Sequence, residues 1–279
     1  MSVLIADSGS TKTDWALLAG GTVQRYKTEG LNPYFHSTES IKSVLRSGLR
    51  PSLREHAVEC ILFYGSGCDS PEKITGMEKA LNQVFPGVRA EVHEDLLGAA
   101  RACCFDQPGI VSILGTGSNS CRYDGTRIVQ QIPSLGYILG DEGSAGFFGQ
   151  QLLNRYYRDE LPADLKTTLE QEYEMDLELI VEGIYHNEQS SRYVASFSSF
   201  LGENRGHPYV QSMLESGFRE FIERIILKYE SPEDYQIHFI GSLGHAYRGM
   251  ISRLLTSYDL TPGKFIQRPM QRLIEFHTQ

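Results

Sequence analysis

No stretch of the 279-residue sequence approaches the roughly 20 apolar residues that a helix needs to cross a bilayer. Positive charge is also scarce, because 26 lysine and arginine residues stand against 35 aspartate and glutamate residues and the formal net charge is −9. No long basic run provides the electrostatic footprint of a nucleic-acid or membrane-surface protein. We therefore expect neither a nucleic acid nor a membrane as a partner.

Cysteine is sparse and irregularly spaced. An odd number of cysteines in a chain of this length gives no disulfide framework, and no pair has zinc-finger spacing; they are Cys60, Cys68, Cys103, Cys104 and Cys121. The N-terminus runs directly into an apolar strand-like segment, without the basic region or small-residue cleavage site of a signal peptide. We expect a cytoplasmic protein whose cysteines are small apolar core residues.

Glycine, by contrast, is plentiful and gathers in three polar turns that each follow a strand-like run. The three segments are 5–15 (IADSGSTKTDW), 113–119 (ILGTGSN) and 239–244 (FIGSLG). Glycine allows the backbone to approach an anion, and successive N–H groups in such a turn form a nest for phosphate oxygens. Two phosphate-type turns far apart in sequence indicate a nucleotide held between two halves of the protein. Asp7, in the first turn, would serve the metal that accompanies the phosphates.

Strand and helix patterns divide the chain into two similar halves. Each half opens with a strand, a glycine-rich turn and two further strands joined by a hairpin. Mixed strands that alternate with helices predict an α/β fold with a cleft between two domains. We predict helices over 37–47, ending before Pro51, and over 71–84, 94–103, 243–255 and 270–277, with a mostly helical segment over 144–229. The first domain is expected to cover 1–106 together with the last helix, 269–279, and the second to cover 107–268.

The three turns, in this order, resemble the two phosphate loops and the adenosine motif of the sugar kinase, heat-shock 70 and actin superfamily. A fourth segment, 140–145 (GDEGSA), is similar to the N-acetylglucosamine kinase-like branch of the family that also contains the BadF/BadG/BcrA/BcrD ATPases. The resemblance extends over nearly the whole chain. It implies a two-domain actin-like ATPase (ribonuclease H-like) fold that binds ATP and Mg²⁺, with nucleotide and sugar in the interdomain cleft.

Asp95 is the candidate catalytic base, because the resemblance places the family's catalytic aspartate where a strand passes into a helix. A carboxylate near a sugar hydroxyl can accept its proton as the bond to phosphorus forms. Two alternatives stay open: Asp95 merely caps its helix, or Glu94 takes one of these roles. Asp7 is the candidate Mg²⁺ residue, acting through water; its alternative is a turn residue at the end of a strand.

The remaining candidate residues divide into those for the nucleotide and those for the sugar. The nucleotide candidates are Gly9, Ser10, Thr11, Lys12, Gly115, Thr116, Gly117, Gly241 and Ser242. The sugar candidates are Asn32, Gly67, Asn119, Gly136 and Asp141, among which an amide and a carboxylate suit vicinal hydroxyls because they supply both donors and acceptors. Structural alternatives remain: ordinary turns for the glycines, a solvated lysine for Lys12, and a cap for the helix near Ser144 in the case of Asp141.

The function implied by the resemblance is ATP-dependent phosphorylation of an amino sugar, foremost N-acetylglucosamine to its 6-phosphate. N-acetylmuramic acid or another sugar is an alternative acceptor, and Leu135 stands where some N-acetylglucosamine kinases carry tryptophan. A second alternative is an ATPase that activates an iron–sulfur enzyme, although no evident cysteine pair would bridge a cluster. A third is a non-catalytic sugar sensor or assembly protein. A homodimer is the candidate assembly, and Trp15 is expected in the core.

Overall fold

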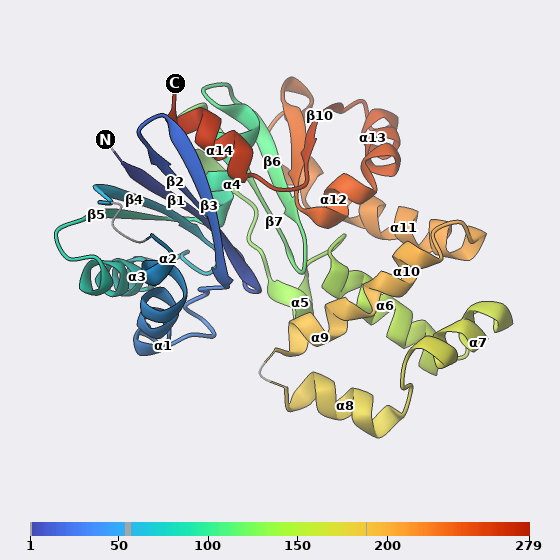
Figure 1. Cartoon of the computed structure of the whole chain (residues 1–279). Helices are drawn as coiled ribbons and strands as arrows, with labels where there is room; N and C mark the ends of the chain where they lie inside the picture. The colour runs from blue at the N-terminus through green and yellow to red at the C-terminus, as the bar shows by residue number, and fades with distance from the viewer. Residues whose placement is uncertain (1, 54–56, 188) are drawn as a thin grey trace. The chain divides into compact units, whose positions relative to one another are not determined.

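The computed structural model describes residues 2–53, 57–187 and 189–279, which divide into two compact units. Unit 1 comprises Met1–Pro108, Tyr123–Ile128 and Arg268–Gln279, and unit 2 comprises Gly109–Arg122 and Val129–Gln267. Each unit is built on one five-stranded sheet covered by helices (Figure 1). The chain is therefore an α/β protein.

The sheet of unit 1 has the strand order β3-β2-β1-β4-β5. Its strands are β1 (Val3–Ser8), β2 (Lys12–Ala19), β3 (Thr22–Glu29), β4 (Cys60–Gly65) and β5 (Arg89–Glu94). β2 runs antiparallel to both β1 and β3, whereas β1, β4 and β5 are mutually parallel. The parallel strands consequently bring their carboxyl ends to one edge, where the first glycine-rich turn, the loop after β4 and the start of the helix after β5 come together.

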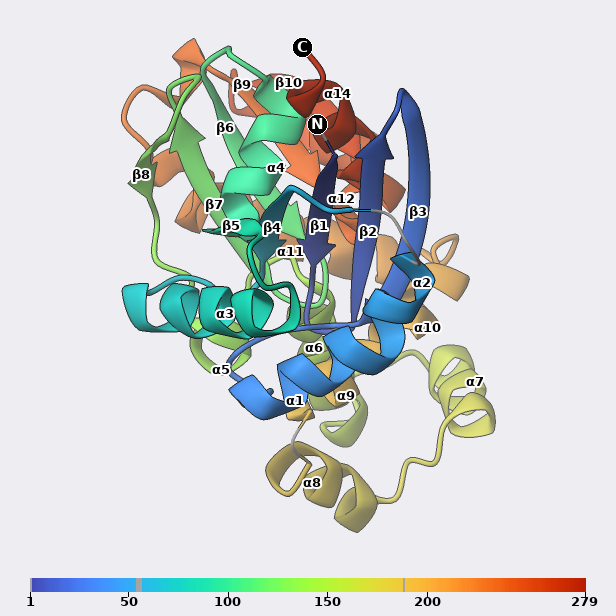
Figure 2. The same ribbon diagram turned by 60° about the vertical axis from the view of Figure 1, so that its left-hand side comes forward.

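Helices cover both faces of this sheet. On one side of the sheet lie α1 (Thr38–Val44), the π-helical turn Leu45–Leu49, α2 (Arg50–Leu53) and α3 (Pro71–Val84), and the ribbon in Figure 2 shows α1, α2 and α3 there. The core between this face and these helices includes Trp15 and Phe63. The other face is covered by α4 (Asp95–Cys104) and by α14 (Met270–His277), which returns from the end of the chain. Trp15 is 1% exposed, which confirms the prediction that it is a core residue.

The sheet of unit 2 has the order β10-β9-β6-β7-β8, with β6, β9 and β10 parallel. Its strands are β6 (Gly109–Leu114), β7 (Ser118–Tyr123), β8 (Ile128–Gln131), β9 (Gln236–Ile240) and β10 (Thr261–Ile266). The helices are α5 (Gly136–Leu139), α6 (Ala145–Tyr157), α7 (Ala163–Glu172), α8 (Leu177–Tyr185), α9 (Ser190–Ser196), α10 (Ser198–Glu203), α11 (Pro208–Arg224), α12 (Ser242–Ala246) and α13 (Arg248–Ser257), with 3₁₀ turns at Ile226–Lys228 and Pro232–Asp234. A large aromatic and aliphatic core lies between the sheet and these helices.

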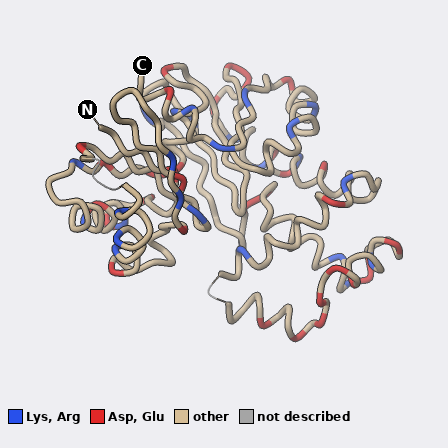
Figure 3. The backbone as a smooth tube through the Cα atoms, in the orientation of Figure 1, with Lys and Arg blue, Asp and Glu red and all other residues tan. Residues whose placement is uncertain are grey.

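Helix α8 departs from the usual amphipathic pattern. Leu177, Leu179, Val181 and Tyr185 are all exposed, and Ile180 is its one buried residue. Its charged residues are all acidic, and Figure 3 shows no blue position along this helix. None of the described helices is long and apolar enough to pass through a bilayer.

Two of the predicted helices differ from those in the structure. The first helix does not stop before Pro51 but continues through a π-helical turn into α2. The widened turn comes directly before the proline, whose ring would otherwise crowd the preceding helical carbonyl. The predicted helix 243–255 is interrupted at Tyr247 and forms α12 and α13. Helices 71–84 and 270–277 have the predicted bounds.

Candidate active site

The first glycine-rich turn is a tight connection between β1 and β2. The N–H group of Gly9 donates to the carbonyl of Lys12 at 3.0 Å, and residues Gly9 to Lys12 are exposed. Gly30 lies beneath the turn, because a Cβ atom there would be 2.4 Å from the carbonyl oxygen of Gly9 and 2.5 Å from that of Ser10. Gly30 is not among the predicted site residues, because a single glycine after a strand forms no motif. Unit 1 thus presents an exposed polar turn whose position depends on a close backbone approach.

Asp7 and Asp14 lie side by side at this end of the sheet. They are register partners on β1 and β2, and the Nζ of Lys12 is 3.3 Å from Oδ2 of Asp14. Burial, then the nearby carboxylate of Asp95, then that of Asp14, raise the pKa of Asp7 from 3.8 to about 7, while Lys12 opposes the shift. Asp14 is not among the predicted site residues, because an aspartate within a strand carries no motif of its own.

Asp95 begins α4, immediately after β5, and its carboxyl is near that of Asp7. Burial and then the adjacent charge of Glu94 raise the pKa of Asp95 to about 7, although backbone hydrogen bonds from Leu96 and from Asp95 itself favour the ionised form. A carboxyl group with a pKa near neutrality is suited to accept a proton from a hydroxyl. Glu94, not Asp95, occupies the N-cap position of α4, and its side chain makes no cap hydrogen bond.

Further carboxyl groups make this region electrostatically negative. Burial, followed by the charge of Asp69, raises the pKa of Glu94, and Asp69 also contributes to the raised pKa of Asp95. Excess negative charge of this kind is relieved by a divalent cation. The described residues hold no group of three or more metal-ligating side chains. Asp7 nevertheless fits Mg²⁺, which keeps most of its water and commonly binds one carboxylate plus phosphate oxygens.

Asn32 is held between the first turn and the loop that follows β4. Its Nδ2 donates to Oγ of Ser10 at 3.1 Å and to Oγ of Ser66 at 3.3 Å, and its Oδ1 accepts from the N–H of Tyr34 at 2.9 Å. Asn32 is only 5% exposed. Gly67, at φ +78°, passes so close that a Cβ atom there would be 2.4 Å from Oδ1 of Asn32. The structure therefore brings Asn32, Gly67 and the first turn together, with both amide protons of Asn32 bonded within the protein.

In unit 2, the second glycine-rich turn is fixed to the start of α6. The N–H of Gly115 donates to the carbonyl of Gly117 at 3.0 Å. The carbonyls of Gly115 and Thr116 each accept a hydrogen bond of 2.9 Å from the N–H groups of Ala145 and Gly146, respectively. The turn thus joins two adjacent strands, β6 and β7, and is held in place by a helix terminus.

Asp141 lies beneath this second turn. It is 9% exposed, has φ +58°, and accepts hydrogen bonds from the N–H of Ser118 and, at 3.3 Å, from Oγ of Ser134. A Cβ atom on Gly117 would be 2.6 Å from Oδ2 of Asp141. Burial raises the pKa of Asp141. The alternative that Asp141 caps the following helix is wrong, because Ser144 is the N-cap of α6 and accepts from Phe147.

The other sugar candidates of unit 2, Asn119 and Gly136, precede Asp141 in the sequence. The Oδ1 of Asn119 accepts from the N–H of Ser120 at 2.9 Å and from Nε2 of Gln131 at 3.3 Å. Gly136, at φ +70°, opens α5 with nothing near its Cβ position, and Leu135 before it is 61% exposed. The short helix α5 was not predicted from the sequence.

The third turn lies beside the second. Gly241, at φ +116°, is the N-cap residue of α12, and a Cβ atom there would be 2.2 Å from the carbonyl oxygen of Leu114, the residue before Gly115. The N–H of Gly241 donates to Ile266 at 3.0 Å, and Ser242 is exposed. The candidate residues therefore form two groups, one around Asp7 and Asp95 in unit 1 and one around residues 115–117, Asp141 and Gly241 in unit 2.

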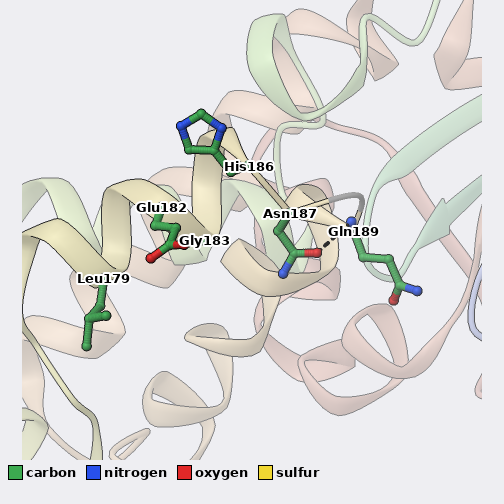
Figure 4. A pocket seen from close by; sticks show the side chains of 6 residues that line it. All are labelled: Leu179, Glu182, Gly183, His186, Asn187 and Gln189. Atoms are coloured by element: carbon green, nitrogen blue, oxygen red, sulfur yellow. Dashed lines mark hydrogen bonds between the residues drawn. The ribbon is translucent and has the colours of Figure 1, made fainter.

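A separate hollow of about 560 Å³ on the helical part of unit 2 involves none of these residues. Figure 4 shows Leu179, Glu182, Gly183, His186, Asn187 and Gln189 around it. Among the residues drawn, the N–H of Gln189 donates to Oδ1 of Asn187 at 2.8 Å, and the N–H of His186 donates to the carbonyl of Glu182 at 2.9 Å. Its described lining residues include a single carboxylate, Glu182, and none of the glycine-rich turns, so we do not assign the chemistry to it.

Comparison with solved structures identifies the family. The structure of a proposed N-acetylglucosamine kinase from Porphyromonas gingivalis is similar, with 39% sequence identity and a TM-score of 0.93. The match covers 99% of this chain and 98% of the Porphyromonas gingivalis chain. The chain belongs to the N-acetylglucosamine kinase-like family of sugar kinases. The resemblance drawn from the four sequence motifs is confirmed, and so is the two-domain actin-like ATPase fold.

More distant members of this fold share its architecture. A proposed N-acetylglucosamine kinase from Chromobacterium violaceum matches 99% of the chain and 98% of its own, at 17% identity and a TM-score of 0.76. The match to a ROK family glucokinase from Streptomyces griseus, solved with glucose and AMPPNP, covers 99% of this chain and 97% of the glucokinase, at 14% identity and a TM-score of 0.55. At these identities the likeness concerns the fold alone. No family model matches the chain, and no curated protein does.

Proposed function

We propose that this chain transfers the γ-phosphoryl group of ATP to a hydroxyl group of an amino sugar, and that N-acetylglucosamine, phosphorylated at its 6-hydroxyl, is the acceptor. The observation that carries the proposal is the pair Asp7 and Asp95, two carboxyl groups with pKa values raised to about 7 beside an exposed glycine-rich turn. The family relationship supports the kinase class.

Each residue has a role in this reaction. Asp95 would accept the proton of the sugar hydroxyl while its oxygen forms a bond to the γ-phosphorus and the bond from that phosphorus to the β-γ bridging oxygen breaks, which releases ADP. Asp7 would hold Mg²⁺ through water; when bound, the metal supplies charge neutralisation for the phosphates. The backbone of residues 9–12 and 115–117 would contact the phosphates, and Gly241 and Ser242 the adenosine.

We propose that Asn32, Gly67, Asn119, Gly136 and Asp141 surround the sugar. Asn32 would take part chiefly by setting the positions of Ser10 and Ser66, since its amide protons already bond to these hydroxyls. Asp141 carries an acceptor next to the second turn. The negative region formed by Asp69, Glu94 and Asp95 favours an uncharged acceptor over N-acetylmuramic acid, because a second carboxylate there would be repelled.

The activator alternative requires accessible thiolates for a cluster shared between subunits. Cys68, Cys103, Cys104 and Cys121 are buried and Cys60 is partly exposed; burial raises the pKa of Cys68 to about 12 and also raises that of Cys60. This donor set suits core packing better than cluster ligation. We also keep the cytoplasmic location and the homodimer as proposals; the exposed apolar side chains of α8 offer a surface for a second copy.

The test uses Asp95→Asn and a coupled ADP-release assay with N-acetylglucosamine, glucosamine, N-acetylmuramic acid and glucose. We expect N-acetylglucosamine to give the highest kcat/KM with the unchanged protein. The substitution should lower kcat by about 10²- to 10⁴-fold, the usual contribution of a positioned base, and leave AMPPNP affinity within a few-fold. Near-normal turnover by Asp95→Asn would refute the assignment of the base, and a preference for N-acetylmuramic acid would refute the acceptor.

A further inference from the structure

A row of polar side chains crosses the sheet of unit 1 on the face covered by α4 and α14. Asp14, Asp7, Tyr64 and His93 are successive register partners on β2, β1, β4 and β5. Because register partners point to the same side of a sheet, these four side chains stand in line. Asp7 is the proposed metal residue, and Tyr64 is its immediate neighbour. Tyr64 is completely buried, so its contacts are all with protein groups.

The contacts of Tyr64 join α4 to the sheet at two points. A Cβ atom on Gly98 would lie 2.8 Å from Cγ of Tyr64 and 2.9 Å from its Cβ, so the helix backbone rests directly on the tyrosine. Arg101, one turn further along α4, donates from Nη1 to the hydroxyl of Tyr64 at 2.6 Å. Gly98 follows Asp95 by three residues, which is about 4.5 Å along a helix axis.

The hydroxyl of Tyr64 also reaches the C-terminal helix. It lies 2.9 Å from Nε2 of His277 on α14, and the ring of Tyr64 stacks on that of His93 with centroids 5.5 Å apart. Burial, followed by the charges of Arg101 and His93, lowers the pKa of His277 to about 4. A neutral imidazole can accept at Nε2, and Arg101 can only donate, so the single proton of the tyrosine is directed to His277. The hydrogen bonds therefore run from Arg101 to Tyr64 to His277.

We propose that Tyr64 is a positioning residue for phosphoryl transfer, which fixes the height and direction of the first turn of α4 and thereby the place of Asp95 beside Asp7. Arg101 and His277 hold Tyr64 in this position. The inference rests on the proposed function of Asp95. It predicts that a displacement of α4 by a fraction of an ångström changes the rate of the chemical step, because misplacement of reacting groups by about 1 Å can cost 10²-fold.

Two substitutions test this from opposite sides of the contact. Tyr64→Phe keeps the ring under Gly98 and removes only the hydroxyl, whereas Gly98→Ala introduces a methyl group 2.8 Å from the ring. We expect kcat to fall about tenfold for Tyr64→Phe and about 10²-fold for Gly98→Ala, with KM for ATP and AMPPNP affinity within twofold. Adding Tyr64→Leu to Gly98→Ala should recover part of kcat, because the smaller side chain makes room for the methyl group.

The chain offers a matched control for each change. Tyr26 on β3 donates its hydroxyl to Gln24 at 2.6 Å, and Gly76 in α3 has nothing within 4 Å of its Cβ position. Tyr26→Phe and Gly76→Ala should leave both kcat and KM within twofold of the unchanged protein. A loss of kcat in these controls equal to that in Tyr64→Phe would overturn the proposal, since the effect would then be a general one.

Hydrogen exchange of the amides in the first turn of α4 separates this proposal from the proposed function. We expect faster exchange there in Tyr64→Phe, whatever reaction the protein catalyses. If the unchanged protein phosphorylates no sugar but this exchange is faster, the proposed function fails while the attachment of α4 to Tyr64 stands. If Tyr64→Phe is folded, exchanges normally and keeps kcat within twofold, the positioning role is refuted. Tyr64→Phe carries this conclusion even if Gly98→Ala does not fold.

Discussion

Removing the proposed base should stabilise the metal-free protein at alkaline pH. A carboxyl group whose pKa is higher in the folded than in the unfolded state binds its proton more tightly when folded. Its contribution to stability is therefore complete below pH about 4 and is lost as the pH rises through the folded value of about 7 for Asp95. Asp95→Asn abolishes this titration, and it also removes a charge that raises the pKa of Asp7. Both effects favour the variant as the pH increases.

The magnitude follows from the size of the pKa shift. The pKa of Asp95 rises from 3.8 to about 7 on folding, which is roughly three units. Each unit corresponds to 1.36 kcal/mol, so ionisation of Asp95 costs the folded protein about 4 kcal/mol of stability at high pH. About three-fifths of this contribution, or about 2–3 kcal/mol, is lost between pH 5 and pH 8.5, and the partial exposure of Asp95 reduces this figure further. We expect the variant to gain about 1–2 kcal/mol relative to the unchanged protein over this interval, which is about 3–6 °C in Tm for a protein of this size.

The assay is calorimetry of both proteins in a chelator at pH 5 and pH 8.5. Asp234→Asn, at an exposed aspartate in a 3₁₀ turn, is the matched control and should show no pH-dependent gain. A difference in Tm between Asp95→Asn and the unchanged protein that is constant with pH, or that decreases at pH 8.5, would refute the reasoning. It would mean that Asp95 is well solvated and that its pKa is not raised.

Two further predictions concern glycines that the turns require. Gly30→Ala should cost about 1–3 kcal/mol of folding stability and weaken AMPPNP binding, because the new Cβ would lie 2.4 Å from the carbonyl oxygen of Gly9 in the first turn. Chemical denaturation measures the loss of stability, and fluorescence titration measures the binding. Unchanged AMPPNP binding would contradict the prediction. Gly117→Ala should reduce sugar-dependent kcat/KM at least tenfold, because the new Cβ would lie 2.6 Å from Oδ2 of Asp141 and displace that carboxyl group. Gly115→Ala is the control, since there is open space at its Cβ position. Equal losses for the two variants in the ADP-release assay would argue against this role.

The sequence predicted the architecture well because its signals were local. Pro71 at the first turn of α3 and the acidic entry into α4 mark helix starts that the structure reproduces to within one residue. The order of glycine-rich turns indicated the family, which the 39% identical structure confirms. The π-helical turn before Pro51 was missed because a proline within a helical pattern predicts a helix end, and the interruption at Tyr247 was missed because no proline marks it.

The candidate site was predictable only where residues carry a motif. Asp7, Asp95 and the turn glycines could be chosen from sequence, and the structure places Asp7 and Asp95 near each other. Gly30 could not be chosen, because the atoms that leave no room for a side chain there belong to Gly9 and Ser10, about 20 residues earlier in the chain. Tyr64 could not be chosen either, since a tyrosine in an apolar strand is expected to be an ordinary core residue. The roles of all these residues in catalysis stay predictions.

The position of α14 has a consequence for how the protein is made. Its buried side chains, Met270, Leu273 and Ile274, belong to unit 1, yet they follow the whole of unit 2 along the chain. The ribosome makes the sheet of unit 1 first, so the part of its face that α14 covers stays exposed while unit 2 is being translated. A nascent chain cut short before residue 270 should consequently depend on chaperones.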